Sequence, residues 1–288
     1  MHTELIDSVQ LYGVFSEKIH GITPVRRLKM TTRKFLVRTA AFVTAAVIAS
    51  VSFTGCGKSV KSPGATMYKG SSRAETYDIN GDSTGYTDMA NYTLPESGDE
   101  IVVMTIKDKG TVKIKLFPDL MPRACANFVG LAVQGYYDGL TFHRVIADFM
   151  IQGGDPEGTG RGGESVWGGR FDGGTTDYLY HVKGALAYAN SGATIYDGSQ
   201  FYIVVGQKFT DNEVFDKYKN ASFSYTENAR NAYADNGGTP WLDGDYTVFG
   251  QVFEGIEIIE DVCSNTVVDS SDKPLDDVII EKVEVVTY

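Results

Sequence analysis

Apolar and polar residues alternate along the C-terminal part of the chain with the period of two that is typical of β-strands. From Val112 to Leu116 apolar side chains alternate with two lysines, so one face of this predicted strand is apolar and the other is polar. The strand-like pattern begins at Ile101. Further short strands are predicted near 141–146, 149–153, 185–190, 199–205, 246–252 and 277–287.

Two segments between these strands have the features of helices. In the first, Asp119 is the expected N-cap, Pro122 lies in the first turn and Gly135 ends the helix. A second helix is predicted near 254–263. About eight short strands with two flanking helices favour a mainly β fold, a closed eight-stranded antiparallel barrel.

The segment from Phe142 to Pro156 places one cation among apolar and amide side chains. Side chains two apart on a strand point to the same face, so Arg144 and Gln152 can reach one cleft, with Phe149 and Met150 as its apolar part. Such a site has a fixed donor, an amide and a hydrophobic pocket, but no nucleophile and no carboxylate pair. It suits a reaction in which no covalent bond is made or broken.

Taken one at a time, these residues also have an ordinary structural interpretation. Phe149 and Met150 would then belong to the core, Arg144 would be a solvated strand residue, and Gln152 would lie in a turn. The whole ordered string, together with the segments that follow it, argues against that interpretation. These segments are AYANSG at 187–192, GSQFYI at 198–203, WLDG at 241–244 and YTVFG at 246–250.

In this order the segments resemble the cyclophilin family of peptidyl-prolyl isomerases, over about residues 99–288. The resemblance implies the same β-barrel fold and an enzyme that accelerates rotation about X-Pro bonds without a cofactor. Its partners would be proline-containing polypeptides, unfolded or exported proteins, and we expect a monomer.

The resemblance also implies roles for individual residues. The catalytic positions would be Arg144, Gln152 and Phe149, with Arg144 as the hydrogen-bond donor. The substrate-binding positions would be Met150, Ala189, Asn190, Gln200, Tyr202, Trp241, Leu242 and Tyr246.

Two of these positions depart from the commonest family pattern. Tyr202 stands where a phenylalanine usually lines the proline pocket, and Tyr246 stands where a histidine is often found. Either hydroxyl could narrow or hydrate the pocket and so change substrate preference. A binding module that holds proline peptides without turnover is the alternative that these two residues leave open, whereas Arg144 argues against it.

An insert from Lys208 to Gly238 separates two of the matched segments. Residues 211–220 and 225–233 are predicted to form two short helices. We interpret the insert as a packed structural elaboration. Because it ends beside Trp241, a partner-binding role is the alternative, and a scaffold acting through the insert would be a third function.

The N-terminal region has the order of a bacterial lipoprotein signal. Residues 30–38 form a basic segment, 39–53 are uncharged and mostly apolar, and Phe53-Thr54-Gly55-Cys56 resembles a lipobox. We expect residues 1–29 to be a non-native extension, 30–55 a signal peptide and Cys56 the lipidated residue. The competing interpretation is an uncleaved transmembrane anchor. Both place the domain outside the cytoplasm, anchored to the bacterial cell membrane.

Residues 56–98 are rich in Gly, Ser, Thr and Asp and are predicted to form a flexible linker to the isomerase domain at 99–288. From residue 56 onward the chain has 19 basic and 34 acidic side chains, a formal charge of −15. Such a surface repels nucleic acid. Cys125 and Cys263 are predicted to be buried thiols rather than a disulfide, and no Cys or His cluster has metal-ligand spacing.

Overall fold

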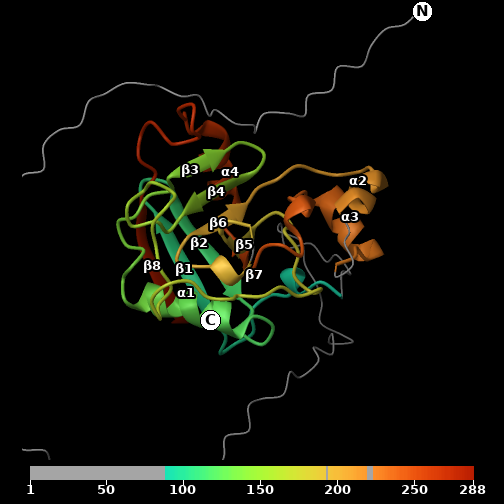
Figure 1. Cartoon of the computed structure of the whole chain (residues 1–288), viewed down its shortest axis with the longest axis horizontal. Helices are drawn as coiled ribbons and strands as arrows, with labels where there is room; N and C mark the ends of the chain where they lie inside the picture. The colour runs from blue at the N-terminus through green and yellow to red at the C-terminus, as the bar shows by residue number, and fades with distance from the viewer. Residues whose placement is uncertain (1–87, 193, 219–222) are drawn as a thin grey trace, which may run out of the picture. The chain divides into compact units, whose positions relative to one another are not determined.

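A computed structural model describes residues 88–192, 194–218 and 223–288. Within these ranges eight strands form one antiparallel sheet in the order β3-β4-β6-β5-β7-β2-β1-β8 (Figure 1). The strands are β1 (Glu100–Ile106), β2 (Gly110–Leu116), β3 (Arg144–Ile146), β4 (Met150–Gly153), β5 (Ala185–Tyr188), β6 (Phe201–Val204), β7 (Val248–Glu254) and β8 (Ile280–Thr287). The α-helices of the same ranges are α1 (Pro122–Val133), α2 (Asn212–Tyr218), α3 (Glu227–Asp235) and α4 (Ile256–Asn265).

The pairing of β1 with β2 follows directly from their alternating side chains. Val102 pairs with Ile114 and Met104 pairs with Val112, and all four side chains are fully buried. The lysines of β2 point to the other, partly exposed face. Burying apolar surface stabilises the folded state by about 25 cal/mol per Å². Any other register of β1 and β2 would expose some of these four side chains, so their burial fixes the register. The period-two pattern predicted for 112–116 is confirmed.

The sheet is open, so the expectation of a closed barrel is wrong. β3 and β8 are its two edge strands. The segments before them meet at an isolated bridge between Thr141 and Ile279. β3 itself is too short to continue this pairing. The N–H of Val145 in β3 donates instead to the carbonyl of Asp272, in the loop that precedes β8 (2.9 Å). The strands that would close the barrel therefore stay apart.

The two flanking helices occur where the sequence predicts them. α1 has proline at its start, but the predicted cap is wrong, because the N-cap position is Met121 and Asp119 does not cap the helix. Phe128 of α1 is fully buried among aromatic rings of the sheet and its connections. Its ring centroid lies 4.8 Å from that of Tyr137, 5.4 Å from Phe201 and 5.5 Å from Phe249.

α1 and α4 each carry one cysteine, and both thiols are free and buried. Cys263 of α4 donates to the carbonyl of Ile146 (2.9 Å), while Cys125 of α1 lies 3.5 Å from the carbonyl of Phe249. Burial raises the pKa of Cys125 to about 12. The prediction of two buried thiols in place of a disulfide is confirmed.

The insert folds as the two predicted helices, α2 and α3. They enclose a hydrophobic cluster of their own, distinct from the core under the sheet. Phe215 and Tyr233 of the insert are buried in it together with Met89 and Tyr92 from the N-terminal side of the domain. The interpretation of the insert as a packed elaboration is therefore confirmed.

The folded part begins earlier than the predicted boundary at residue 99. Residues Ala90–Tyr92 form a 3-10 helix whose side chains are all buried. Asn91 donates to the carbonyl of Tyr180 (3.1 Å) and to Oε1 of Gln251 (2.9 Å), and its own Oδ1 accepts from the N–H of Tyr180 (2.9 Å). The expected linker is thus too long at its C-terminal end, because residues 89–92 belong to the domain.

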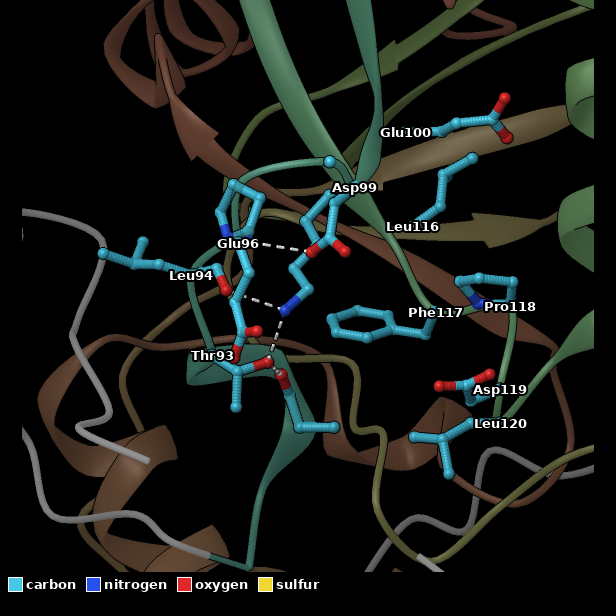
Figure 2. A pocket seen from close by; sticks show the side chains of 14 residues that line it. Thr93, Leu94, Glu96, Asp99, Glu100, Leu116, Phe117, Pro118, Asp119 and Leu120 are labelled. Atoms are coloured by element: carbon cyan, nitrogen blue, oxygen red, sulfur yellow. Dashed lines mark hydrogen bonds between the residues drawn. The ribbon is translucent and has the colours of Figure 1, made fainter. Parts of the chain in front are cut away.

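A hollow of about 670 Å³ lies between the segment 93–100 and the end of β2. Figure 2 shows the side chains that line it. The ammonium group of Lys115 lies in it and donates to the carbonyl of Leu94 (2.8 Å) and to Oγ1 of Thr93 (3.0 Å). Burial lowers the pKa of Lys115, and the nearby carboxylates of Asp99 and Glu96 oppose that shift. These contacts hold the N-terminal segment on the sheet.

Among the described residues no helix is both long and apolar enough to cross a membrane. The expected extension at 1–29, the expected signal at 30–55 and Cys56 lie outside the described residues.

Replacing Asn91 with alanine should destabilise the protein by about 2–3 kcal/mol, because the buried N–H of Tyr180 would lose its acceptor. Denaturant unfolding measures this change in the free energy of unfolding. Asn265→Ala, at an exposed position at the end of α4, is the matched control and should change it by less than about 0.5 kcal/mol. Equal stabilities of the two variants would show that residues 89–92 are not an integral part of the domain.

Candidate active site

A cavity of about 190 Å³ opens between β3, β4 and β6 and the segments that follow β5 and precede β7. Nine of the eleven residues predicted for the active site line it. They are Arg144, Phe149, Met150, Gln152, Ala189, Asn190, Tyr202, Leu242 and Tyr246.

Strand register explains how the cation, the amide and an aromatic ring come together. Arg144 of β3 pairs with Gln152 of β4, and Gln152 pairs in turn with Tyr202 of β6. Residues directly opposite one another on antiparallel strands project from the same face, about 4.5–5.5 Å apart at Cβ. One row across three strands therefore presents three different chemical groups to the cavity.

Arg144 lies at the edge of this row and is partly exposed. Its Nε is 3.5 Å from Oδ2 of Asp272, and both side chains are 42% exposed. An exposed pair of this length contributes little to stability. The pair engages only Nε, while a guanidinium carries four further N–H donors on its terminal nitrogens. Arg144 can thus offer fixed, charged donors to a bound molecule.

Gln200 does not line the cavity but orients a residue that does. Gln152 donates through Nε2 to Oε1 of Gln200 (2.9 Å), and Gln200 donates through its own Nε2 to the carbonyl of Gly162 (2.8 Å). The loop that carries Gly162 is held by Asp155, whose carboxylate accepts the backbone N–H groups of 157, 159, 160 and 161. These hydrogen bonds lower the pKa of Asp155 despite its burial.

Trp241 also lies outside the residues that line the cavity, although it was predicted as a wall. Its ring packs behind Phe149, with 5.8 Å between the centroids. On its other sides it contacts Phe209 (5.9 Å) and Tyr218 (6.3 Å) of the insert. Trp241 therefore supports the wall that Phe149 forms.

The hydroxyl of Tyr202 is turned away from solvent and bonded to a histidine. It lies 2.9 Å from Nε2 of His181, and Tyr202 is 4% exposed. Tyr246 stands edge-on to Tyr202, with 6.2 Å between the ring centroids. The expectation that the Tyr202 hydroxyl hydrates the pocket does not fit this geometry, because the group already has a buried partner.

Sequence reasoning missed His181 and Asp197, which support the site from behind. Asn190 donates through Nδ2 to Oδ1 of Asp197 (2.9 Å), and Thr247 donates through its hydroxyl to Oδ2 (2.6 Å). Asp197 is fully buried, and burial raises its pKa to about 6. An isolated histidine and an isolated aspartate carry no sequence motif, so only the fold reveals these roles.

In the part of the chain that the structure describes, no group of three His, Cys, Asp or Glu residues could hold a metal ion. The cavity is lined by a cationic donor, two amides, two tyrosines and four apolar side chains.

Comparison with known proteins identifies the family. Residues 101–285 match the family model described as cyclophilin type peptidyl-prolyl cis-trans isomerase/CLD. The chain belongs to this family of isomerases. Relatives from Staphylococcus haemolyticus (strain JCSC1435) and Staphylococcus aureus (strain USA300), each named "Putative peptidyl-prolyl cis-trans isomerase", are 48% and 46% identical over 202 residues. These alignments cover 68% of this chain and 98% and 99% of the relatives.

Solved structures of a cyclophilin type peptidyl-prolyl cis-trans isomerase from Cryptosporidium parvum are also similar. One, determined in the presence of the dipeptide Ala-Pro, has a TM-score of 0.51 and 31% sequence identity, over 65% of this chain and 99% of that one. Another structure of the same enzyme has a TM-score of 0.52 and 32% sequence identity, over 66% of this chain and 99% of that one. The fold of the cyclophilin domain and its isomerase activity follow from these matches.

The raised pKa of Asp197 predicts a pH dependence of stability in this isomerase. Between about pH 4 and pH 6 the folded state keeps the proton while the unfolded state loses it, so stability should fall as pH rises through this window. A shift of about two pH units corresponds to roughly 3 kcal/mol. Thermal or denaturant unfolding of the wild type and of Asp197→Asn across this range measures the difference.

Glu281→Gln, which removes an exposed carboxylate of β8, is the matched control and should follow the wild-type profile. Parallel profiles for wild type and Asp197→Asn would contradict the burial effect.

Proposed function

We propose that this cyclophilin accelerates X-Pro isomerisation in exported polypeptides and assists their folding outside the cytoplasm, with the cavity as its proline pocket. The observation that carries the proposal is the row formed by Arg144, Gln152 and Tyr202, which lines one cavity together with the apolar side chains of Phe149, Met150 and Leu242. At about 190 Å³ the cavity is smaller than the usual 300–1,000 Å³ of pockets for whole small molecules. It suits one ring of an extended peptide, and the Ala-Pro dipeptide used with the relative from Cryptosporidium parvum supports this choice.

The mechanism follows from what limits rotation about a prolyl bond. The amide must lose its resonance at the twisted geometry, a barrier of ~18–20 kcal/mol. Unaided exchange takes on the order of tens to hundreds of seconds. In the twisted state the lone pair returns to the prolyl nitrogen, which becomes a better hydrogen-bond acceptor. A donor that binds this state more strongly than the planar one lowers the barrier.

Each group of the site has a role in this scheme. Phe149, Met150 and Leu242 would hold the proline ring while the other side of the bond rotates. Gln152, oriented by Gln200, would anchor the peptide backbone. Arg144 would donate to the twisted amide, because a guanidinium stays protonated at any working pH and needs no proton transfer.

The remaining predicted residues complete the peptide-binding surface. Ala189 and Asn190, just after β5, would lie along the peptide, and the ring of Tyr202, held through its hydroxyl by His181, would close the pocket. Tyr246 lies at an angle to that ring, and Trp241 would act from behind Phe149.

Arg144→Ala should lower kcat/KM for a proline tetrapeptide by about 10²–10³-fold, equivalent to ~3–4 kcal/mol of lost barrier lowering. Peptide binding should suffer less, because the apolar walls remain. A protease-coupled isomerisation assay on the full chain measures the effect. The same assay tests whether the wild type accelerates isomerisation.

Arg123→Ala is the matched control, since Arg123 is exposed on α1 and lies over the rings of Trp167 and Phe171 rather than at the cavity. Its activity should equal that of the wild type. A folded Arg144→Ala protein with wild-type activity would refute the donor role. A wild type that binds proline peptides without accelerating their isomerisation would instead favour a binding module.

The location outside the cytoplasm rests on the N-terminal sequence. The basic segment at 30–38, the apolar run at 39–53 and the small pair Thr54-Gly55 before Cys56 support a cleaved signal and a lipid anchor on Cys56. The chain from 56 to the folded part would then act as a tether between membrane and enzyme.

In the native host, Cys56→Ser should leave an unlipidated precursor, which mass spectrometry of the membrane fraction would detect. The wild type should carry the mass of a lipid and begin at residue 56. A wild-type protein of unmodified mass that retains residues 30–55 would overturn the proposal and favour a transmembrane anchor.

A further inference from the structure

A buried chain of hydrogen bonds leads from the insert to the wall of the proline cavity. Tyr233 lies in α3, fully buried, and its hydroxyl donates to Oδ2 of Asp243 (2.5 Å). The other oxygen of Asp243 accepts the backbone N–H of His181 (2.7 Å) and lies 2.7 Å from its ring Nδ1. Nε2 of the same ring lies 2.9 Å from the hydroxyl of Tyr202, which lines the cavity.

Chemistry sets the direction of the hydrogen bonds to Asp243. A carboxylate only accepts, so Nδ1 of His181 carries a proton that faces Asp243. In the tautomer with its single proton on Nδ1, Nε2 accepts a hydrogen bond from the hydroxyl of Tyr202. Every donor in the chain therefore points toward Asp243, and a change at Tyr233 alters the group that orients His181.

All four side chains are at least 96% buried, so water cannot replace a missing partner. In a buried network each bond polarises the next, and a broken member leaves the others unsatisfied. The imidazole ring is also nearly parallel to the ring of Tyr202, at an interplanar angle of 12°. The ring centroids are 6.0 Å apart, so His181 holds Tyr202 through the hydroxyl at the end of its ring.

A second set of contacts reaches Phe149, another residue that lines the cavity. Phe209 and Tyr218 of the insert pack against Trp241, and Trp241 packs against Phe149. Phe149 and Tyr202 both line the cavity, yet neither belongs to the insert. The insert therefore supports two walls of the cavity through intermediate residues.

We infer that the 208–238 insert is a positioning element of the active site, which sets the shape of the proline pocket through Tyr233, Asp243 and His181 on one side and Trp241 on the other. This inference deepens the proposed function and rests on the cavity being the proline pocket. Tyr233, Asp243 and His181 are positioning residues, because they act on the substrate only through Tyr202.

Tyr233→Phe in the full chain tests the inference, since it removes one oxygen atom at a position outside the cavity. We expect kcat/KM for a proline tetrapeptide to fall about 5- to 10-fold. We also expect the NMR signal of the His181 Nδ1 proton to shift, because Asp243 loses a donor. Tyr202→Phe should give a loss of similar size, and the double variant should lose little more than either single one, as expected for residues in one network.

Tyr92→Phe is the matched control. Tyr92 is buried in the same cluster of the insert, and its hydroxyl accepts from Nδ2 of Asn236 (3.2 Å). This variant should lower the melting temperature to a similar extent but keep wild-type kcat/KM and the wild-type His181 signal. The comparison separates a loss of stability from a loss of positioning.

If Tyr233→Phe loses stability but keeps wild-type kcat/KM, as Tyr92→Phe should, the network is purely structural and the inference is wrong. The same conclusion follows if the losses of Tyr233→Phe and Tyr202→Phe multiply in the double variant. Should Tyr233→Phe fail to fold, Phe209→Leu tests the inference through Trp241, because Phe209 is half-buried and packs against that ring. We expect a several-fold loss of kcat/KM, and wild-type activity would contradict the inference. An inactive wild type would refute the proposed function itself, which is a different result.

Discussion

The pairing of β4 with both of its neighbours is the constraint on which the active site depends. Two registers, Arg144 with Gln152 and Gln152 with Tyr202, place a guanidinium, an amide and an aromatic ring in one row. A shift by one residue in either pairing would turn these side chains to the other face of the sheet. Because the apolar residues of β4 and β6 are buried in the core, such a shift would also expose them. Packing and the proposed catalysis therefore require the same register.

Three side chains of the candidate site have buried polar partners. Gln200 orients Gln152, Asp197 orients Asn190, and His181 orients Tyr202. A buried polar group without a partner would cost about 1–3 kcal/mol, so each support stabilises the fold while it fixes the geometry of the site. A reaction that depends on a well-placed donor rather than on bond making benefits from such rigidity.

Much of the fold and of the site could be predicted from the sequence, because both have local signals. Alternation at Val112–Leu116 predicted a strand, and the ordered segments around Arg144 predicted most residues that line the cavity. What the sequence did not show depends on long-range geometry. Whether the sheet closes depends on the length of β3 and on the carbonyl of Asp272, which accepts the N–H of Val145. Neither feature can be recognised from a pattern in the sequence. Gln200 and Trp241 differ from their predicted positions because a motif identifies residues near a site without distinguishing a lining side chain from its support.

The open sheet has a further consequence for an enzyme whose substrates are polypeptides. An exposed strand edge can capture an extended chain by adding it as another strand. In this sheet both edges are blunted: the N–H of Val145 is taken by the carbonyl of Asp272, and the N–H of Val283 in β8 by the carboxylate of Asp138 (3.0 Å). β8 also presents a charged pair, Lys282 and Glu284, to solvent. Strand addition at either edge is therefore disfavoured, so an extended chain that meets this sheet finds no free row of backbone donors to pair with at these positions.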